Sequence, residues 1–245
     1  MKILRVFSWL LLLFLWSPLF FLLLKGLRAD AFTRLLSNDD LILVFGRSML
    51  LAVSACVIST VLATITAFAI PGLGRIGKAV VEFGVILPMV LPEIAFGISY
   101  LVWFTKIGMP LGWTTLILAH VAFTFSYAVM VMKTSVEKIE WNYLDAAKDL
   151  GAAKIASFRH AILPQLVPGL VASSVMAFSL SLDDFLISFF VKGIDQVTLP
   201  IKVYSMMRRS VGPEIYALSV VLFCISVFSV LISQVWFIKS QKSRV

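Results

Sequence analysis

The sequence predicts an all-α integral membrane protein with six transmembrane helices. Of its 245 residues, 60% are hydrophobic and only 14% are charged, and the mean hydropathy is +1.01. Soluble domains are about half apolar and about a quarter charged. The apolar residues form continuous stretches, each long enough to cross a ~30 Å hydrocarbon core at ~1.5 Å per residue. Outer-membrane strands would instead show ~10-residue segments of alternating polarity, so helices are predicted.

The six predicted spans are separated by short polar or turn-forming segments. No linker or low-complexity stretch divides them, so we predict one transmembrane domain over residues 1–245 with its core at about residues 44–238. The spans are predicted at Val6–Leu24, Ser48–Ile70, Ala79–Phe104, Ile107–Met132, Leu166–Val191 and Ile215–Ile238.

The distribution of basic residues predicts that both termini are cytoplasmic. Six spans place the two termini on the same side, and more than half of the 21 Lys and Arg residues fall on that side. Cytoplasmic loops carry such an excess. Because these residues are scattered between apolar stretches, the net charge of +8 does not indicate nucleic-acid binding.

The turn at residues 72–79 matches G-x-G-x-x-G and most of a phosphate-binding G-x-x-x-x-G-K-[ST] motif. A phosphate-binding loop needs a strand before it, and the second motif needs a hydroxyl where this chain has Ala79. We therefore interpret the segment as a basic turn between two spans, and no nucleotide site is predicted.

The longest polar loop, residues 133–165 between the fourth and fifth spans, is predicted to form two short helices. The first covers Trp141–Leu150, and Gly151 suits the left-handed conformation that ends a helix. The second begins at Ala152 and is expected to stop before Leu163 and Pro164, because proline cannot continue a helix.

This loop resembles the "EAA" loop of permeases in ATP-binding-cassette (ABC) importers of the binding-protein-dependent, type I (MetI-like) family. The resemblance implies a coupling helix that docks in a groove of a separate ATPase, with small side chains allowing close approach. Asp145 stands where the family usually has Glu. The matching residues are Asp145, Ala146, Ala147, Gly151, Ala152, Leu163 and Pro164.

The same resemblance implies the partners and the location. A second, homologous permease completes the pathway, two copies of the ABC ATPase hold ATP and Mg²⁺, and a periplasmic or lipid-anchored substrate-binding protein delivers the substrate. The chain itself is then a non-catalytic subunit that binds membrane lipid and no cofactor or metal. Its expected location is the bacterial inner (cytoplasmic) membrane.

Acidic residues inside the spans mark a candidate substrate pathway. A carboxylate near the bilayer centre costs about 2.5–3.5 kcal/mol on insertion scales, so Glu93, Asp183 and Asp184 need a reason to be there. Pro92 precedes Glu93 and could open a polar cavity at that depth. Glu82 lies near the cytoplasmic end of the third span, so we interpret it as structural.

Helical spacing predicts which side chains share a face. On a continuous fifth helix, Asp184 falls on an arc with Ser174, Ser181 and Ser188, and Asp183 points to the opposite side. On the third helix an aromatic stripe follows the acid and could attract cations; its members with Glu93 are Phe96, Tyr100 and Trp103. Both stripes also fit plain helix packing. The lone His120 of the fourth span is interpreted as a packing residue.

Segments outside the loop resemble polyamine (spermidine/putrescine) importer permeases, over roughly residues 40–235. These segments are 179–185, 198–206 and 211–218. The resemblance implies transport of a polycation, for which membrane carboxylates make chemical sense. The segment Leu199–Arg209 is expected to form a short amphipathic helix, either a contact for the binding protein or a plain connector.

Two alternatives stay open at this point. The first alternative is an importer of iron(III), thiamine or phosphonate, because the loop at residues 133–165 resembles a loop shared by importers of many ligands. A stand-alone channel or membrane enzyme that uses Glu93, His120 and Asp184 is the second. The sequence does not distinguish which polyamine is carried, whether the permease pair is a homodimer or a heterodimer, or which conformation is the resting one.

Overall fold

The computed structural model describes residues 2–242, and every regular element in this range is helical. The elements, in chain order, are α1 (Lys2–Gly26), α2 (Ala29–Leu36), α3 (Asp39–Ala69), η1 (Ile70–Gly72), α4 (Arg75–Val90), α5 (Glu93–Lys106), α6 (Trp113–Glu137), α7 (Asn142–Asp149), α8 (Lys154–Ser157), η2 (Phe158–Ile162), α9 (Leu163–Asp183), α10 (Leu186–Val191), α11 (Leu199–Met207) and α12 (Pro213–Lys242).

The predicted number of spans, six, is confirmed if the bent pair of helices α4 and α5 is counted as one span. Five helical stretches are individually long and apolar enough to cross a membrane, and α4 with α5 makes the sixth. The single-domain prediction covers residues 1 and 243–245 as well, which lie outside the described residues. The cytoplasmic location of the termini stays a prediction.

The centre of the molecule is a packed group of three helices, α3, α6 and α9. Small residues such as Ala63 and Ala128 are fully buried between them, which lets the helix backbones approach closely. Hydroxyl pairs cross the interfaces: Ser59 Oγ lies 2.7 Å from Thr124 Oγ1, and Thr60 Oγ1 lies 3.1 Å from Ser174 Oγ. Apolar packing and buried hydrogen bonds together hold this core.

Helix α3 begins earlier than predicted, because a short helix precedes it. The segment Ala29–Leu36 forms α2, and Asn38 caps α3 by accepting a hydrogen bond from Leu41 N at 3.0 Å. Asp39 and Asp40 in the first turn favour a helix start at this point. The predicted start at Ser48 therefore missed more than two turns of α3.

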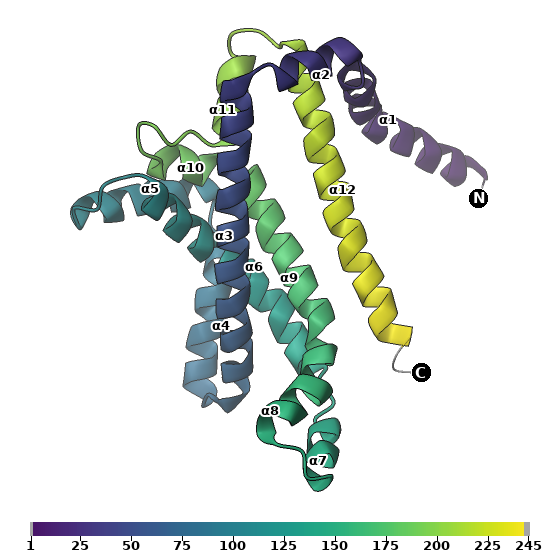
Figure 1. Cartoon of the computed structure of the whole chain (residues 1–245), viewed down its shortest axis with the longest axis vertical. Helices are drawn as coiled ribbons and strands as arrows, with labels where there is room; N and C mark the ends of the chain where they lie inside the picture. The colour runs from purple at the N-terminus through teal and green to yellow at the C-terminus, as the bar shows by residue number, and fades with distance from the viewer. Residues whose placement is uncertain (1, 243–245) are drawn as a thin grey trace.

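The predicted third span, Ala79–Phe104, is wrong as one straight helix. Helices α4 and α5 meet at an angle of 110° across Leu91 and Pro92. Proline restricts the residue before it to an extended backbone, and Leu91 is extended with ψ of 140°. Pro92 is the N-cap residue just before α5, where a missing N–H leaves no helical hydrogen bond unmade. As a result, α5 leaves the direction of α4 and runs sideways (Figure 1).

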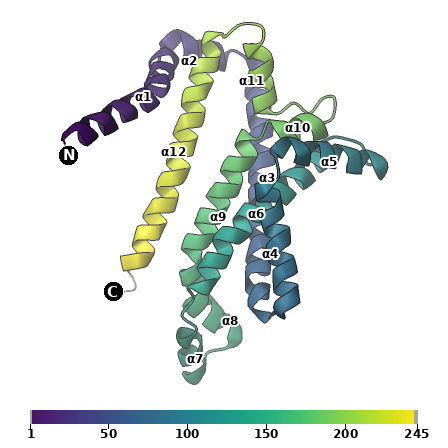
Figure 2. The same cartoon turned by 180° about the vertical axis from the view of Figure 1, so that it is seen from behind.

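The predicted fifth span, Leu166–Val191, is also wrong as one continuous helix. Helix α9 ends at Asp183, the backbone is extended at Asp184, and α10 resumes at Leu186. Helix α10 lies alongside α5, and the two form a lateral arm that projects from the core (Figures 1 and 2). We call α5 and α10 together the lateral arm.

The second helix of the long loop was predicted to stop before Leu163, which is also wrong. Helix α8 passes through a π-helical turn, η2, directly into α9. Pro164 has no N–H to donate to the carbonyl of His160, four residues earlier, and Leu163 N–H bonds the carbonyl of Phe158, five residues earlier. The chain absorbs the proline by widening one turn.

The short helices gather at opposite ends of the molecule. Helices α7 and α8 lie at the end formed by the lower parts of α6 and α9, and α2 and α11 lie at the other end (Figures 1 and 2). Leu199 of α11 is buried, and Val203 and Met206 pack against the same cluster. This confirms the predicted amphipathic helix at Leu199–Arg209.

Candidate functional site

Two regions contain the residues predicted to be functional. The first is the end made by α7, α8 and the start of α9, which we call the coupling end. Helix α7 spans Asn142–Asp149, close to the predicted Trp141–Leu150, and Gly151 follows with φ of +79°. The predicted left-handed glycine is therefore present.

Gly151 is required by its backbone conformation and not by lack of space. A Cβ built at Gly151 would meet no atom within 4 Å, but a residue with a side chain at this φ is strained. Ala146 and Gly151 are exposed, and Ala147 and Ala152 are partly exposed. These four small residues thus form one patch of low bulk in the loop.

The coupling end also exposes large apolar side chains at its tip. Leu150 is 89% exposed and Ile155 is 83% exposed, at the positions that flank the turn around Gly151. Helix α7 is otherwise polar, with Asp145 paired to Lys148 at 3.0 Å. Leu150 and Ile155 are therefore available for contact with another protein.

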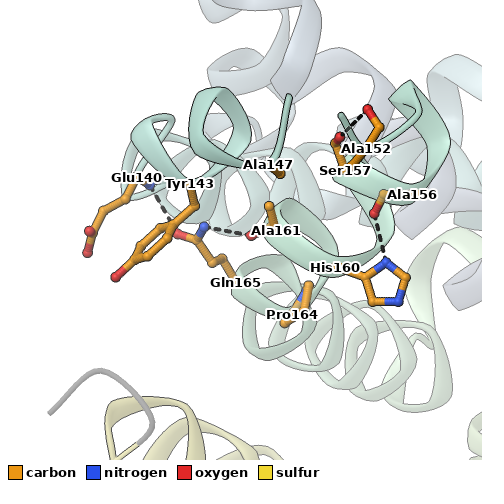
Figure 3. Close-up of a pocket in the computed structure, with 10 residues that line it drawn as sticks. All are labelled: Glu140, Tyr143, Ala147, Ala152, Ala156, Ser157, His160, Ala161, Pro164 and Gln165. Carbon is orange, nitrogen blue, oxygen red and sulfur yellow. Dashed lines mark hydrogen bonds between the residues drawn. The ribbon is translucent and has the colours of Figure 1, made fainter. Parts of the chain in front are cut away.

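A cavity of about 480 Å³ lies behind this tip, between α7 and the π-helical turn (Figure 3). Three of the predicted residues, Ala147, Ala152 and Pro164, line it. Gln165 fixes its wall by accepting a hydrogen bond from Glu140 N at 3.0 Å and donating to Ala161 O at 2.8 Å. Leu163 is partly buried and is not among the lining residues. The lining residues are Glu140, Tyr143, Ala147, Ala152, Ala156, Ser157, His160, Ala161, Pro164 and Gln165.

The second region lies where the lateral arm meets the core. Here Glu93, the first residue of α5, and Asp183, the last residue of α9, line one cavity of about 410 Å³. We call it the carboxylate cavity; its lining residues are Leu91, Glu93, Phe123, Tyr127, Ser179, Leu180 and Asp183. Both helix breaks thus contribute an acid to the same space.

Asp183 also borders a second cavity, of about 610 Å³, between α9, α11 and α12. Ser179 lines both cavities as well. Tyr204 of α11 faces this second space, and its ring lies 4.9 Å from that of Phe185. Asp183 is exposed between the two hollows.

Asp184 has different surroundings from those predicted. It is only 4% exposed, and its carboxylate accepts hydrogen bonds from Ile187 N at 3.1 Å and Ser188 N at 2.7 Å at the start of α10. It is also paired with His120 Nε2 at 3.3 Å. Asp183 is among the residues that line the carboxylate cavity, and Asp184 lies behind the lining, with its carboxyl group within interaction range of the Glu93 carboxyl group.

His120 is bonded on both ring nitrogens. Nδ1 lies 2.7 Å from Ser181 Oγ, and Nε2 lies 2.9 Å from Ser188 Oγ. Nε2 also faces the carboxylate of Asp184, which can only accept, so a proton on Nε2 can be donated to it. The predicted grouping of Ser181, Asp184 and Ser188 is therefore confirmed, and it surrounds a histidine of α6. The role of Asp184 in a substrate pathway stays a prediction.

The predicted aromatic stripe contains two side chains that pack inside the protein and one that is exposed. Phe96 and Tyr100 are partly buried, with ring centroids 5.3 Å apart, and Phe96 also lies 6.2 Å from Phe123 of the carboxylate cavity. Trp103 is 54% exposed and lies beyond the cavity. Glu82 pairs with Lys133 at 2.5 Å, which agrees with the structural role we assigned to it.

Sequence reasoning interpreted His120 as a packing residue, which its burial agrees with, but it did not find the polar partners of His120 or the close contact at Gly97. The signal for His120 was available: the polar residues at 181, 184 and 188 needed a polar partner on a facing helix, and the fourth span contains one histidine. Gly97 gave no such signal, because its role depends on how closely α10 approaches α5.

These features define a multi-pass membrane permease with a surface prepared for another subunit. Comparison with known proteins makes the family specific. The chain belongs to the family described as the binding-protein-dependent transport system inner membrane component, whose model matches residues 59–243. It is therefore a multi-pass inner membrane protein that works in a complex with other ABC transporter subunits.

Two curated relatives are named as polyamine permeases. The chain is 33% identical to the spermidine/putrescine transport system permease protein PotC of Haemophilus influenzae, over 86% of this chain and 82% of the relative. It is 34% identical to the putrescine transport system permease protein PotI of Escherichia coli, over 76% of this chain and 68% of the relative.

A solved structure supports the fold. The chain is similar to part of a bacterial ABC transporter involved in the import of the acidic polysaccharide alginate, with a TM-score of 0.68 and 14% identity. The match covers 98% of this chain and 94% of the other. At this identity the likeness bears on the architecture alone.

Proposed function

We propose that the chain is one permease subunit of an ATP-driven importer of linear polyamines such as spermidine and putrescine. The names of its relatives support this substrate class. The observation that carries the proposal is the pairing of Glu93 and Asp183 in one cavity at the edge of the core.

The chemistry of this cavity favours a flexible polycation. Two carboxylates supply negative charge, and the rings of Phe123 and Tyr127 supply faces that attract cations. An anionic ligand such as phosphonate would meet repulsion here. A linear polyamine offers several ammonium groups joined by apolar methylene segments, so it can satisfy both acids and cover the rings.

The coupling end supports the proposal that two copies of a separate ATPase drive the transport. Leu150 and Ile155 are apolar side chains in a polar loop, and docking in a groove would remove them from water. The bound ATPases would hold ATP and Mg²⁺, and this chain would act as a non-catalytic subunit. Movement of α7 would pass through η2 into α9, because the three elements are continuous with one another or in contact.

The other partners follow from the same proposal. A second permease would complete the pathway beside the carboxylate cavity, and a substrate-binding protein would deliver the polyamine from outside. We propose the α11 end as the binding protein's contact, because Asp183 borders the cavity that α11 lines.

The test is ATP-dependent uptake by the complete complex in proteoliposomes. Radiolabelled putrescine and spermidine should enter only with internal ATP, and excess unlabelled polyamine should compete. Competition by iron(III), thiamine or phosphonate but not by polyamines would overturn the substrate assignment. Uptake by this chain without its ATPase would overturn the subunit assignment.

A variant sharpens this test. Asp183→Asn should raise KM for polyamines about tenfold or more, because one of the two charges facing the cation is lost. Glu137→Gln is the matched control, since this carboxylate is 59% exposed at the end of α6 and borders neither cavity. Equal KM values for the two variants would contradict the proposed pathway.

A further inference from the structure

The bonds of His120 join two helices that the chain itself leaves separate. Ser181 belongs to α9 and Ser188 to α10, and the backbone between them is extended at Asp184. His120 of α6 contacts all three residues and is 1% exposed. One side chain of the core therefore fixes the end of α9 and the start of α10 relative to each other.

Helix α10 is anchored to α6 at its other end as well. Thr115 Oγ1, in the first turn of α6, donates to Val191 O at 2.8 Å. Both ends of this six-residue helix are thus hydrogen bonded to α6. Helix α10 cannot shift along α6 without breaking buried hydrogen bonds, which cost more when left unpaired than they gain when formed.

Helix α5 in turn rests on α10. Gly97 of α5 approaches so closely that a Cβ would lie 2.7 Å from Phe190 Cδ2 and 3.2 Å from Leu186 O. Helix α5 contacts α10 far more extensively than it contacts α6. The position of α5 is therefore set through α10, and Glu93, its first residue, also interacts with Asp184, the residue that His120 contacts at the break.

These contacts connect His120 to the geometry of the carboxylate cavity. We infer that His120 is a positioning residue that sets the separation between the carboxylates of Asp183 and Glu93, and hence which polyamine chain length the cavity prefers. Asp183 ends α9, which His120 holds through Ser181. Glu93 starts α5, which His120 holds through Ser188 and α10. The inference rests on the proposed function and adds a determinant of specificity.

Three substitutions at His120 separate positioning from simple packing. His120→Leu removes all the polar contacts. His120→Gln places an amide where Nε2 lies and keeps the bond across the break to Ser188, whereas His120→Asn places it near Nδ1 and keeps only Ser181 on α9. The inference expects Gln to preserve the arm and Asn to release it.

The first readout is competition for uptake by α,ω-diamines from diaminopropane to diaminohexane, with the assembled complex. Wild type and His120→Gln should share one preferred length, and His120→Asn and His120→Leu should lose about tenfold of that preference, the effect expected for a displacement on the order of 1 Å. Ser59→Ala is the matched control, because it removes buried bonds between α3 and α6 and none to His120 or α10. An unchanged preference in His120→Leu, or an equal loss in Ser59→Ala, would overturn the inference.

The second readout needs no transport. Nitroxide labels at Trp103→Cys on α5 and Met176→Cys on α9, in a background without Cys56 and Cys224, report the distance between arm and core. The distribution should be narrow in wild type and His120→Gln, and broader or shifted in His120→Asn. Identical distributions would overturn the inference even if polyamine uptake is confirmed, and failed uptake with shifted distributions would remove only the proposed substrate.

If the His120 variants do not assemble, Thr115→Val tests the same inference. It releases the opposite end of α10 and leaves His120 bonded. The inference expects this variant to broaden the same label distance and to weaken the same length preference. No change in either quantity would contradict a clamp made by α6 on α10.

Discussion

The coupling end and the lateral arm are both built from short helices attached to long ones, but their contacts are opposite in kind. At the coupling end, Leu150 and Ile155 are exposed and α7 has no buried residue. In the arm, α10 is bonded at both ends and α5 packs against it without space for a methyl group at Gly97. The comparison teaches that the arm is held in place by contacts within this chain, whereas the coupling end leaves apolar side chains exposed, which agrees with the proposal that a partner covers it.

Substitution at the coupling end should have the largest effect on transport. Gly151→Trp should reduce ATP-driven uptake to background while leaving membrane assembly intact, because it adds bulk to the proposed docking surface. Uptake and ATP hydrolysis by the reconstituted complex measure the coupling. Gly108→Trp is the matched control, since Gly108 also has a positive φ, of +71°, and open space around it. Equal losses would mean that backbone strain alone is responsible.

Removing the buried carboxylate of the arm should have the largest effect on stability. Asp184→Ala leaves His120 and two backbone N–H groups of α10 without their acceptor, and breaking a buried pair costs about 3–5 kcal/mol. Thermal unfolding of the purified complex should show a clearly lower Tm. Asp183→Ala, at the exposed neighbour, should leave the Tm close to wild type. A reversed order would mean that the two aspartates exchange their surroundings in the complex.

The close contact between the arm helices should give an intermediate effect. Gly97→Ala introduces a Cβ 2.7 Å from Phe190 Cδ2, and overpacking of this kind costs about 1–3 kcal/mol. Phe190→Leu removes the ring, so the double variant should recover part of the lost stability. Thermal unfolding of the four proteins gives the coupling between the two sites. Additive losses would show that α5 and α10 do not press on each other here.

The smallest effect is expected for the ion pair between Glu82 and Lys133. It joins α4 to α6, but each side chain is about one-third exposed, and such pairs contribute little. Glu82→Gln should leave both uptake and Tm near wild type. A large change in uptake would show that α4 takes part in the transport movement, which would extend the comparison to a third region.

Several features could be predicted from the sequence because they depend on local chemistry. Gly151 ends α7 where a left-handed residue is needed, and Leu199, Val203 and Met206 give α11 its buried face. Pro92 marked a break in the third span. Its consequence, a 110° turn that sends α5 sideways, depends on α10 being there to receive α5.

Other features could not be predicted because the decisive contacts lie far apart in the chain. Pro164 was expected to end a helix, but a wider turn lets the chain continue from α8 into α9. The facing of Asp183 and Asp184 was predicted for a continuous helix, whereas the chain breaks at Asp184, so that Asp183 lines the cavity and Asp184 is buried beside it. His120 looked like a packing residue until the two serines of α9 and α10 met its ring.

The sequence by itself determined that this chain crosses a membrane several times, that it carries a coupling loop, and that acids lie at membrane depth. These follow from hydropathy, glycine and proline, which act on neighbouring residues. Only the tertiary structure decided which acids share a cavity and which one is buried. That choice depends on helices α5, α6, α9 and α10 meeting, and a buried carboxylate is stable only where donors from several helices converge on it.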